Sequence, residues 1–437
     1  FKCSKIKDST MINRRSFNTI LLGTTALSFA ACTGLTDFTL PSNKRRVVIV
    51  GGGFGGATAA KYLKKFSPDT EVMLIEQNKD YYTCPFSNTV IAGMNKIDYI
   101  KHNYKTLESK YNIVVVHEKV KKVDGATSTV ILEDGTIIPF TKAIVAPGID
   151  FKYEKGYVEG SEEFAPHAYK AGPQTTLLTE QLQEMKDGGT FVMVAPKDPF
   201  RCPPGPYERI SLVAHYLKTN KPKSKIIILD QKNKFSKQGL FQEGWEKLYG
   251  NMIEWRNVEF GGKVVSVDPK NKIVKTEEED VKADVLNYIP DQKAGQLAFD
   301  SGLVTGDWCP INTKTFESKL VKNVYVIGDA AVAAPMPKSG FSANSQAKIA
   351  ALQISRVLAN QPIVNPPKLA NTCYSLVSPT YGISIAAVYE AHEDKIIDLK
   401  DLGAGGLSPM NADEGIRMQE AQYAVGWYKN QMSDIFK

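Results

Sequence analysis

The chain has 437 residues, of which 43% are hydrophobic and 23% charged, a balance typical of a globular protein. A chain of this length exceeds what one hydrophobic core supports, so we expect two or three domains. The formal charge is +7, but residues 1–32 hold five Lys or Arg and one acid, a net of +4, which leaves +3 for the remainder. Such a mild charge does not point to nucleic-acid binding.

The N-terminal segment carries the features of an export signal. Arg14 and Arg15 are followed by an apolar run over residues 20–31 and by small residues before Cys32. The run is too short to span a membrane, and the paired arginines resemble a twin-arginine signal. We therefore expect residues 1–43 to be a signal and linker, no transmembrane span, and a periplasmic mature protein.

Two other interpretations of this segment stay open. The first is a lipoprotein cleavage box at residues 29–32, in which Phe29 replaces the usual Leu and Cys32 would carry a lipid anchor. The second is an uncleaved apolar arm.

Residues 46–76 form the motif around which the chain is organised. Gly51, Gly53 and Gly56 make G-x-G-x-x-G directly after an apolar strand, and a helix and a second strand then lead to Glu76. Such glycines allow a tight turn, let the backbone approach a pyrophosphate and let the helix pack on the strand, while the acid accepts from ribose hydroxyls. This pattern predicts a dinucleotide site.

A second fingerprint, far along the chain, indicates which dinucleotide is bound. Residues 323–330 form an apolar strand that closes on Gly328 and Asp329, and residues 143–148 form another that ends at Gly148. A carboxylate at the strand end, after a glycine that permits close approach, suits a ribityl hydroxyl. The spacing of some 250 residues from the first motif favours FAD over NAD.

The middle of the chain repeats the first motif without its glycines. A strand over residues 190–195, a helix over 207–217 and a strand over 225–230 reproduce the order of a dinucleotide fold. The turn between the first strand and the helix, residues 196–206, has five prolines and one glycine. Because proline has no N–H, this loop cannot present a row of amides to a pyrophosphate. We expect that an NAD site has been lost and the space rebuilt around Cys202.

These patterns predict an α/β chain with two Rossmann-like dinucleotide-binding domains and a C-terminal α+β domain. We expect an FAD-binding domain formed by residues 44–166 and 285–362. Residues 167–284 would form the second, degenerate NAD-type domain. Residues 363–437 would form a C-terminal interface domain.

The remaining segments predict individual elements of these domains. Residues 235–261 are rich in aromatic side chains, which we expect to be partly helical and to belong to the core. Further strands and helices are expected over residues 111–120, 128–140, 263–284, 342–359, 372–377, 383–389 and 413–436.

The cysteines do not form a metal-binding pattern. The six are Cys3, Cys32, Cys84, Cys202, Cys309 and Cys373. None lies in C-x-x-C or C-x-x-C-H, so zinc ribbons, thioredoxin-type pairs and a c-type haem in this chain are not supported. We predict no metal site and treat Cys309 as a buried thiol.

The remaining candidate residues have two interpretations each. A bridge between Cys202 and Cys373 could be a structural link, worth about 5 kcal/mol in the chain-entropy model, or a redox-active disulfide at the flavin. Glu208 is either a helix N-terminal carboxylate or an acid beside that disulfide. Cys84 is either a buried thiol or a site of covalent flavin attachment.

Several motifs together resemble one known family. GGGFGGATAAKY, DYYTC, VAPGID, PFRCPPGPYER, VIGDA and NTCYS are similar to segments of the flavoprotein subunit of flavocytochrome c sulfide dehydrogenase. The resemblance covers essentially the whole mature chain. It implies a periplasmic protein with two dinucleotide folds and FAD, paired with a separate c-type cytochrome.

The resemblance also implies roles for particular residues. Cys84 matches the cysteine joined by a thioether to the flavin, and Trp427 matches a tryptophan packed near the isoalloxazine. Cys202 and Cys373 match the redox disulfide, with Glu208 as the base beside it. Sulfide would attack the disulfide to give a persulfide and a thiolate, and the electrons would pass through FAD to haem.

Two rival functions remain. The first is a sulfide:quinone oxidoreductase of the same fold, favoured by a terminal helix whose side chains could face a membrane, namely Tyr423, Trp427, Ile435 and Phe436. The second is a catalytically silent FAD electron-transfer module that uses Cys202 and Cys373 only as a structural bridge. The proline loop disfavours an NAD(P)H reductase.

Overall fold

The structure is a computed structural model that describes residues 38–40 and 44–437. The expected export signal, the candidate lipid anchor at Cys32 and the linker up to residue 37 lie outside the described residues. Residues Phe38–Lys437 cluster into one unit. In the described part of the chain, no helix is both long and apolar enough to cross a lipid bilayer.

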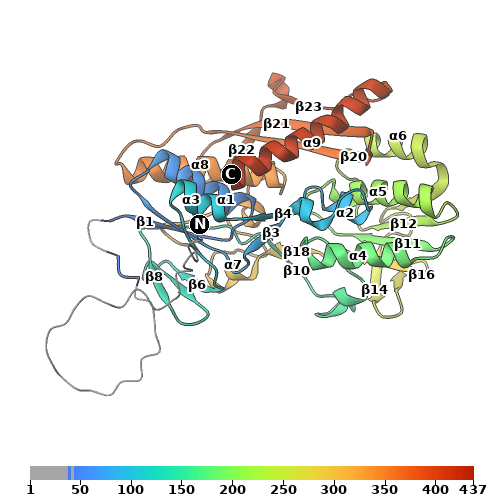
Figure 1. Ribbon diagram of the computed structural model, residues 1–437, viewed down its shortest axis with the longest axis horizontal. Helices are drawn as coiled ribbons and strands as arrows, with labels where there is room; N and C mark the ends of the chain where they lie inside the picture. The colour runs from blue at the N-terminus through green and yellow to red at the C-terminus, as the bar shows by residue number, and fades with distance from the viewer. Residues whose placement is uncertain (1–37, 41–43) are drawn as a thin grey trace, which may run out of the picture. The chain divides into compact units, whose positions relative to one another are not determined.

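A parallel five-stranded sheet carries the glycine motif (Figure 1). Its first two strands are continuous apolar runs that are buried on both faces, as parallel strands between two layers require. The order is β19-β9-β1-β2-β5, with β1 Arg46–Val50, β2 Glu71–Ile75, β5 Val114–Val116, β9 Lys142–Val145 and β19 Val324–Val326. The predicted strand–helix–strand unit is therefore confirmed.

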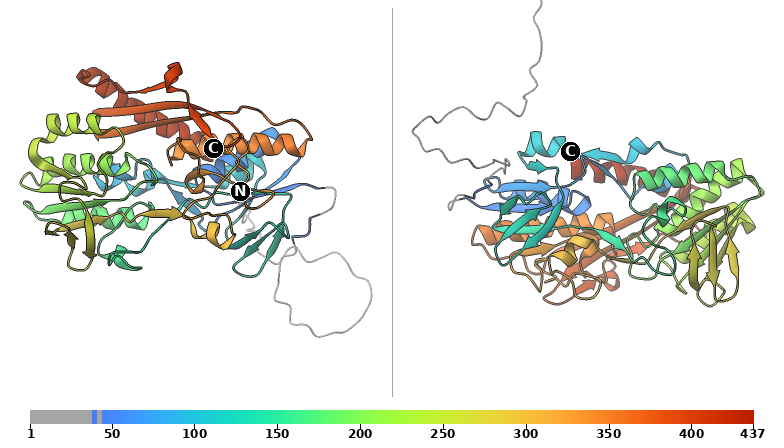
Figure 2. Two further views of the ribbon diagram at one scale, coloured as in Figure 1. Left: turned by 180° about the vertical axis from the view of Figure 1, so that it is seen from behind. Right: turned by 90° about the horizontal axis from the view of Figure 1, so that it is seen from below.

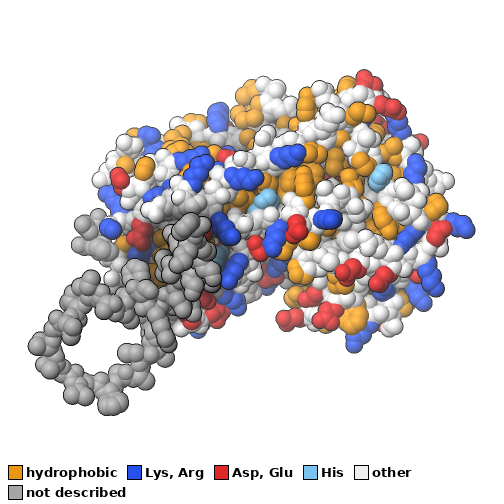
Figure 3. Space-filling view, in the orientation of Figure 1, with side chains coloured by type: hydrophobic (Ala, Val, Ile, Leu, Met, Phe, Trp, Pro, Cys, Tyr) orange, Lys and Arg blue, Asp and Glu red, His pale blue; other side chains and the backbone are white. Residues whose placement is uncertain are grey.

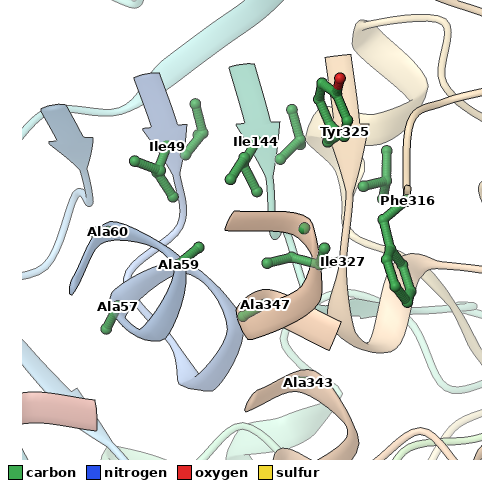
Figure 4. Packing of buried hydrophobic residues seen from close by; sticks show 14 of the residues in the cluster. Ile49, Ala57, Ala59, Ala60, Ile144, Phe316, Tyr325, Ile327, Ala343 and Ala347 are labelled. Carbon is green, nitrogen blue, oxygen red and sulfur yellow. The ribbon is translucent and has the colours of Figure 1, made fainter. Parts of the chain in front are cut away.

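Helices α1 (Phe54–Phe66) and α8 (Gly340–Leu358) pack on this sheet and on each other. Figure 4 shows small side chains on both helices, Ala57 on α1 and Ala347 on α8 among them, on the side of the sheet where Ile49 and Ile144 lie. Because alanine keeps the helices close to the sheet, the helix starts can reach its carboxyl edge. The short helix α3 (Lys105–Tyr111) packs beside α1.

An antiparallel meander contributes its buried side chains to the same core. Its strands are β6 Val120–Asp124, β7 Thr129–Leu132 and β8 Ile137–Pro139, and helix α7 (Gln296–Asp300) packs on β6. The prediction that residues 111–120 form a strand of this meander is wrong. Their apolar part forms β5, which pairs with the free edge of β2 rather than joining the meander.

A second parallel sheet has the order β13-β12-β11-β17. Helices α4, α5 and α6 contribute to the core on one face, and antiparallel strands β14, β15 and β16 cover the other (Figures 1 and 2). The strands are β11 Thr190–Ala195, β12 Lys225–Asp230, β13 Ile253–Arg256, β17 Val285–Tyr288, β14 Val264–Asp268, β15 Ile273–Thr276 and β16 Asp280–Lys282, and the helices α4 Pro173–Glu184, α5 Gly205–Asn220 and α6 Gln238–Tyr249.

Two points about this sheet refine the sequence predictions. The aromatic residues Phe241 and Trp245 belong to its core, as expected. Strand β13 was not predicted, although its four residues, Ile253–Arg256, alternate between apolar and polar side chains, because so short an alternation stands out little within a segment rich in aromatic residues.

The C-terminal segment reaches from the first sheet to the second. Its long strand β20 packs against α8 and against α5 and α6, while α9 packs on β21 (Figure 1). The elements are β20 Lys368–Ser378, β21 Tyr381–Ala391, β22 Ile396–Asp398, β23 Gly405–Leu407 and α9 Glu414–Phe436.

The suggestion that side chains of the terminal helix α9 form one membrane-facing stripe is wrong. Tyr423 is 51% exposed, but Ile435 and Phe436 are 0% and 3% exposed and lie in the core of the first sheet. These residues therefore cannot form one membrane-facing surface.

Short elements complete the connections between the two sheets. Strands β10 and β18 pair with each other where the chain passes between the sheets, and β3 pairs with β4. Their bounds are β3 Asp80–Tyr82, β4 Lys101–Asn103, β10 Ile149–Phe151 and β18 Gln292–Ala294, with helix α2 Ser87–Ile91 and 3-10 turns η1 Ile97–Ile100, η2 Ser161–Glu163, η3 Gly250–Met252, η4 Gly328–Ala330 and η5 Lys400–Leu402.

Candidate active site

The glycine turn between β1 and α1 is closed by tight backbone contacts. Gly51 has φ +98°, and a Cβ there would lie 2.3 Å from the Ala146 carbonyl oxygen. A Cβ on Gly56 would lie 1.7 Å from the Gly51 carbonyl oxygen, so both positions need glycine. Glu76 Oε2 accepts from the Gly52 N–H at 2.8 Å. The structure thus places the acid beside the glycine turn.

The second fingerprint lies next to this turn. Gly328 (φ +76°) and Asp329 form η4, and Ile327 just before them packs on Gly55 of α1. Asp329 Oδ1 is buried and has no hydrogen-bond partner, and burial raises the pKa of this carboxyl group. A buried carboxylate oxygen in need of a donor fits a ribityl hydroxyl. The residues at this edge of the sheet therefore fit FAD.

One cleft brings together the residues predicted to carry the chemistry. Its lining includes Cys84 after β3, Cys202 before α5, Glu208 within α5, Cys373 in β20 and Trp427 in α9. These residues come from segments far apart in the sequence. We call this pocket the three-cysteine cleft.

The cleft cysteines are free thiols in this structure, as is Cys309. The interaction between the neighbouring Cys84 and Cys202 side chains lowers the pKa of the Cys84 thiol to about 7 and raises that of Cys202. Burial raises the pKa of Cys373. Cys309 lies outside the cleft with its side chain fully buried, as expected, and burial raises its pKa to about 12.

The proline loop uses its amides to hold Cys202. The Cys202 N–H donates to the Lys338 carbonyl oxygen at 2.6 Å, and the Gly205 N–H donates to the Cys202 carbonyl oxygen at 2.7 Å. The Tyr169 hydroxyl donates to the same Cys202 oxygen at 3.0 Å. These contacts support the prediction that the loop does not present its amides to a pyrophosphate.

Glu208 is half-buried in the cleft, and both of its carboxylate oxygens accept hydrogen bonds. Oε1 accepts from the Leu376 N–H at 2.9 Å, and Oε2 accepts from Asn88 Nδ2 at 2.8 Å. Burial raises the pKa of Glu208, and these two hydrogen bonds oppose that rise. A half-buried carboxylate with a raised pKa beside a thiol pair is suited to accept a proton.

Sequence reasoning missed two polar residues that hold Glu208. Arg209 is 2% exposed, and its Nε donates to Asn88 Oδ1 at 3.0 Å. Its Nη1 donates to Asn287 Oδ1 and to the His167 carbonyl oxygen. The Nε contact orients the Asn88 amide so that its NH₂ group faces Glu208. The signal in the sequence was a charged pair, Glu208-Arg209, at the start of an apolar helix.

Trp427, in α9, also lines the cleft. Its ring stacks with Phe341 at a centroid distance of 6.3 Å and approaches Tyr374 at the same distance. Trp427 Nε1 is buried without a hydrogen-bond partner. Hydrophobic side chains gather on the surface over the region of α2 and α9 (Figure 3).

Comparisons with known proteins match most of the described chain. Residues 175–290 match the central region of the sulfide dehydrogenase [flavocytochrome c] flavoprotein chain, and residues 365–436 match the flavin-binding region of flavocytochrome c sulphide dehydrogenase. The flavoprotein chain from Chlorobaculum thiosulfatiphilum is 59% identical over 46 residues, which are 10% of this chain and 96% of that sequence. The chain belongs to this family. It is therefore an FAD-binding, sulfide-oxidising flavoprotein.

Other relatives of this flavocytochrome c flavoprotein share its fold. Residues 45–187 match the pyridine nucleotide-disulphide oxidoreductase family. The sulfide-quinone reductase of Aquifex aeolicus is 22% identical over 355 residues, 75% of this chain and 80% of its own. The crystal structure of that organism's sulfide:quinone oxidoreductase superimposes with a TM-score of 0.68 at 17% identity, covering 90% and 92% of the two chains. A putidaredoxin reductase–putidaredoxin complex gives 0.62 at 15% identity, covering 89% and 100%. The predicted fold class is confirmed.

Proposed function

We propose that the chain oxidises sulfide at a redox disulfide between Cys202 and Cys373 and passes the electrons through FAD to a c-type cytochrome. The observation that carries this proposal is the three-cysteine cleft, where both cysteines line one pocket with a half-buried carboxylate, Glu208. Their convergence from the loop before α5 and from β20 supports a disulfide that opens and closes within the cleft.

The protein's own residues supply the first chemical step. Glu208 takes a proton from H₂S, and the resulting HS⁻ attacks one sulfur of the Cys202–Cys373 disulfide. The S–S bond breaks, one cysteine carries the new sulfur as a persulfide, and the other leaves with the electron pair as a thiolate. Such an exchange needs an accessible sulfur and a stabilised leaving thiolate. Both cysteines line the cleft, which would give sulfide access to them.

FAD, when bound, accepts two electrons and returns them one at a time, which suits a haem acceptor. The glycine turn and Glu76 would hold its adenosine and pyrophosphate, and Asp329 its ribityl chain. The Cys84 thiol, whose pKa is lowered, would be the covalent attachment point. The residues assigned to FAD are Gly51, Gly53, Gly56, Glu76, Cys84, Gly148, Gly328, Asp329 and Trp427.

Acid precipitation tests the covalent attachment directly. We expect the yellow chromophore to stay with the wild-type polypeptide and to be released from Cys84→Ser. Cys309→Ser is the matched control, because Cys309 is a buried thiol outside the cleft, and it should retain the flavin. Release of the flavin from wild-type protein would contradict the assignment of Cys84.

The partner and the compartment belong to the same proposal. The family name and the motif resemblance support a separate c-type cytochrome subunit, and residues 1–43 support export to the periplasm. We assign residues 44–166 and 285–362 to the FAD domain, 167–284 to the second domain and 363–437 to the interface with the cytochrome.

A quinone acceptor is the second candidate function. It is favoured by the similarity to the Aquifex aeolicus sulfide-quinone reductase, which extends over 75% of this chain. Anaerobic assays with sulfide and either cytochrome c or decylubiquinone separate the two. We expect cytochrome c to be reduced and decylubiquinone to be reduced far more slowly, and the reverse result would establish the quinone enzyme.

A further inference from the structure

A buried lysine lies beneath the Cys373 strand. Lys237 is 7% exposed, and its Nζ donates to Ser375 Oγ at 2.8 Å and to the Cys373 carbonyl oxygen at 3.3 Å. Its backbone is left-handed, with φ 61°, at the residue before α6. A left-handed, non-glycine residue costs on the order of 1 kcal/mol, and burying an ammonium group adds to that cost. The fold alone does not require a lysine here.

The hydroxyl of Ser375 connects this ammonium group to the Cys373 sulfur. Cys373 and Ser375 are two residues apart in β20, so their side chains lie on the same face of the strand. Because Lys237 donates to Ser375 Oγ, the serine keeps its own proton to donate, and Ser375 contributes to lowering the pKa of Cys373. The ammonium group is thus linked to Cys373 through the Ser375 hydroxyl and through the Cys373 carbonyl oxygen.

Lys237 is the cation that acts on the Cys373 thiol. Burial, the Glu208 carboxylate of α5 and the neighbouring thiol of Cys84 all raise the pKa of Cys373, whereas Lys237 lowers it. The Cys202 thiol faces Cys373 as well. The two guanidinium groups of the cleft, by contrast, act on Cys84. Without Lys237, an anionic sulfur at Cys373 would lose this cation and still face burial and the Glu208 carboxylate, both of which raise its pKa.

We propose that Lys237, acting with Ser375, stabilises the anionic sulfur that forms at Cys373 when the disulfide opens. The inference rests on the proposed function, because it takes Cys373 to be half of the redox disulfide. Lys237 is then a positioning residue for the sulfide reaction. A lower thiol pKa makes Cys373 a better leaving group in the exchange.

Site-resolved alkylation measures this effect without sulfide or an electron acceptor. The reduced holoprotein is treated with iodoacetamide across a pH series, and trypsin then releases residues 369–395, a peptide whose only cysteine is Cys373. We expect Lys237→Gln to raise the apparent pKa of Cys373 by about one unit. Alkylation at a fixed pH below that pKa would then be roughly tenfold slower, because the thiolate is the nucleophile.

Three further variants separate charge from backbone effects. Lys237→Arg keeps the cation and should restore most of the wild-type profile. Lys237→Asn tolerates the left-handed backbone but lacks the charge, so it should be well folded and shifted like Lys237→Gln. Lys234→Gln, at an exposed position three residues earlier, should leave the profile unchanged.

An unchanged Cys373 profile in Lys237→Gln and Lys237→Asn would overturn the inference. So would a Lys237→Arg profile shifted as far as that of Lys237→Gln, since charge would then not be the cause. Sulfide oxidation by wild-type protein is measured separately. If it is absent while the alkylation shift is present, the proposed function fails and the electrostatic role of Lys237 stands.

Discussion

Asn88 Nδ2 donates to the Glu208 carboxylate over 2.8 Å and so joins α2, which follows Cys84, to α5, which follows Cys202. The two cysteine-bearing loops are thereby held against each other through a partly buried polar contact rather than through apolar packing alone. Because Arg209 fixes the other end of the same amide, the position of the Glu208 carboxylate depends on all three residues.

Glu208→Gln tests the base directly. Burial raises the pKa of Glu208, so the ionised base is present above that raised pKa and is lost as the pH falls through it. We expect the variant to oxidise sulfide about 10²–10⁴-fold more slowly and to lose the acidic limb of the kcat/KM profile. Stopped-flow sulfide oxidation between pH 5 and 9 provides the measurement. A variant that kept the wild-type acidic limb would show that another group is the base.

Asn88→Ala should shift the acidic limb of the kcat/KM profile rather than abolish it. The substitution removes one hydrogen bond to the ionised carboxylate, worth about 1 kcal/mol, so the pKa of Glu208 rises further, by roughly one unit. The acidic limb then shifts to higher pH while the plateau rate is largely kept. Asn95→Ala is a matched control, because Asn95 bonds to Thr89 and not to Glu208. Equal profiles for the two variants would contradict the role of Asn88.

Gly205→Ala should disturb Cys202 without changing any reactive group. A Cβ at this position would lie 3.0 Å from Cys202 Sγ and 2.8 Å from the Tyr169 hydroxyl oxygen, so the thiol must shift. We expect slower sulfide oxidation and a higher count of titratable thiols in the oxidised protein. Gly426→Ala, on α9 with no atom within 4 Å of the added Cβ, should keep both properties and gain up to about 1 kcal/mol of stability.

Asp329→Asn should have opposite effects on the apoprotein and the flavin-bound protein. The Asp329 carboxylate is buried with one oxygen unpaired, so at neutral pH the apoprotein carries an unfavourable charge. We expect the amide to stabilise the apoprotein by about 1–3 kcal/mol and to weaken FAD retention. Thermal unfolding of both forms and flavin titration give the comparison. A gain in FAD affinity would show that Asp329 does not serve the cofactor.

The local parts of this structure could be predicted from sequence, whereas the cleft could not be derived from residues alone. The turn at Gly51 follows from a spacing that only glycine satisfies, and β1 and β2 follow from continuous apolar runs. The approach of Cys373 to Cys202, by contrast, depends on β20 packing on α5, which leaves no local pattern. Motif resemblance predicted that pair. It did not identify Lys237, whose burial is a consequence of tertiary packing.

A buried neutral histidine makes the fold sensitive to acid. Burial lowers the pKa of His167 to about 3, and its Nδ1 accepts from the Tyr169 N–H at 3.0 Å. The unfolded chain binds a proton at this residue below about pH 6.5 but the folded protein does not, so stability is full above that pH and falls down to about pH 3. His167→Asn keeps an acceptor and removes this titration. We expect its free energy of unfolding to fall less steeply, by about 1.4 kcal/mol per pH unit, in urea titrations between pH 6 and 4. His102, which is half-buried and also has a lowered pKa, is present in both proteins, so its contribution does not affect the difference between their slopes. Parallel slopes for the two proteins would show that His167 is protonated in the folded state.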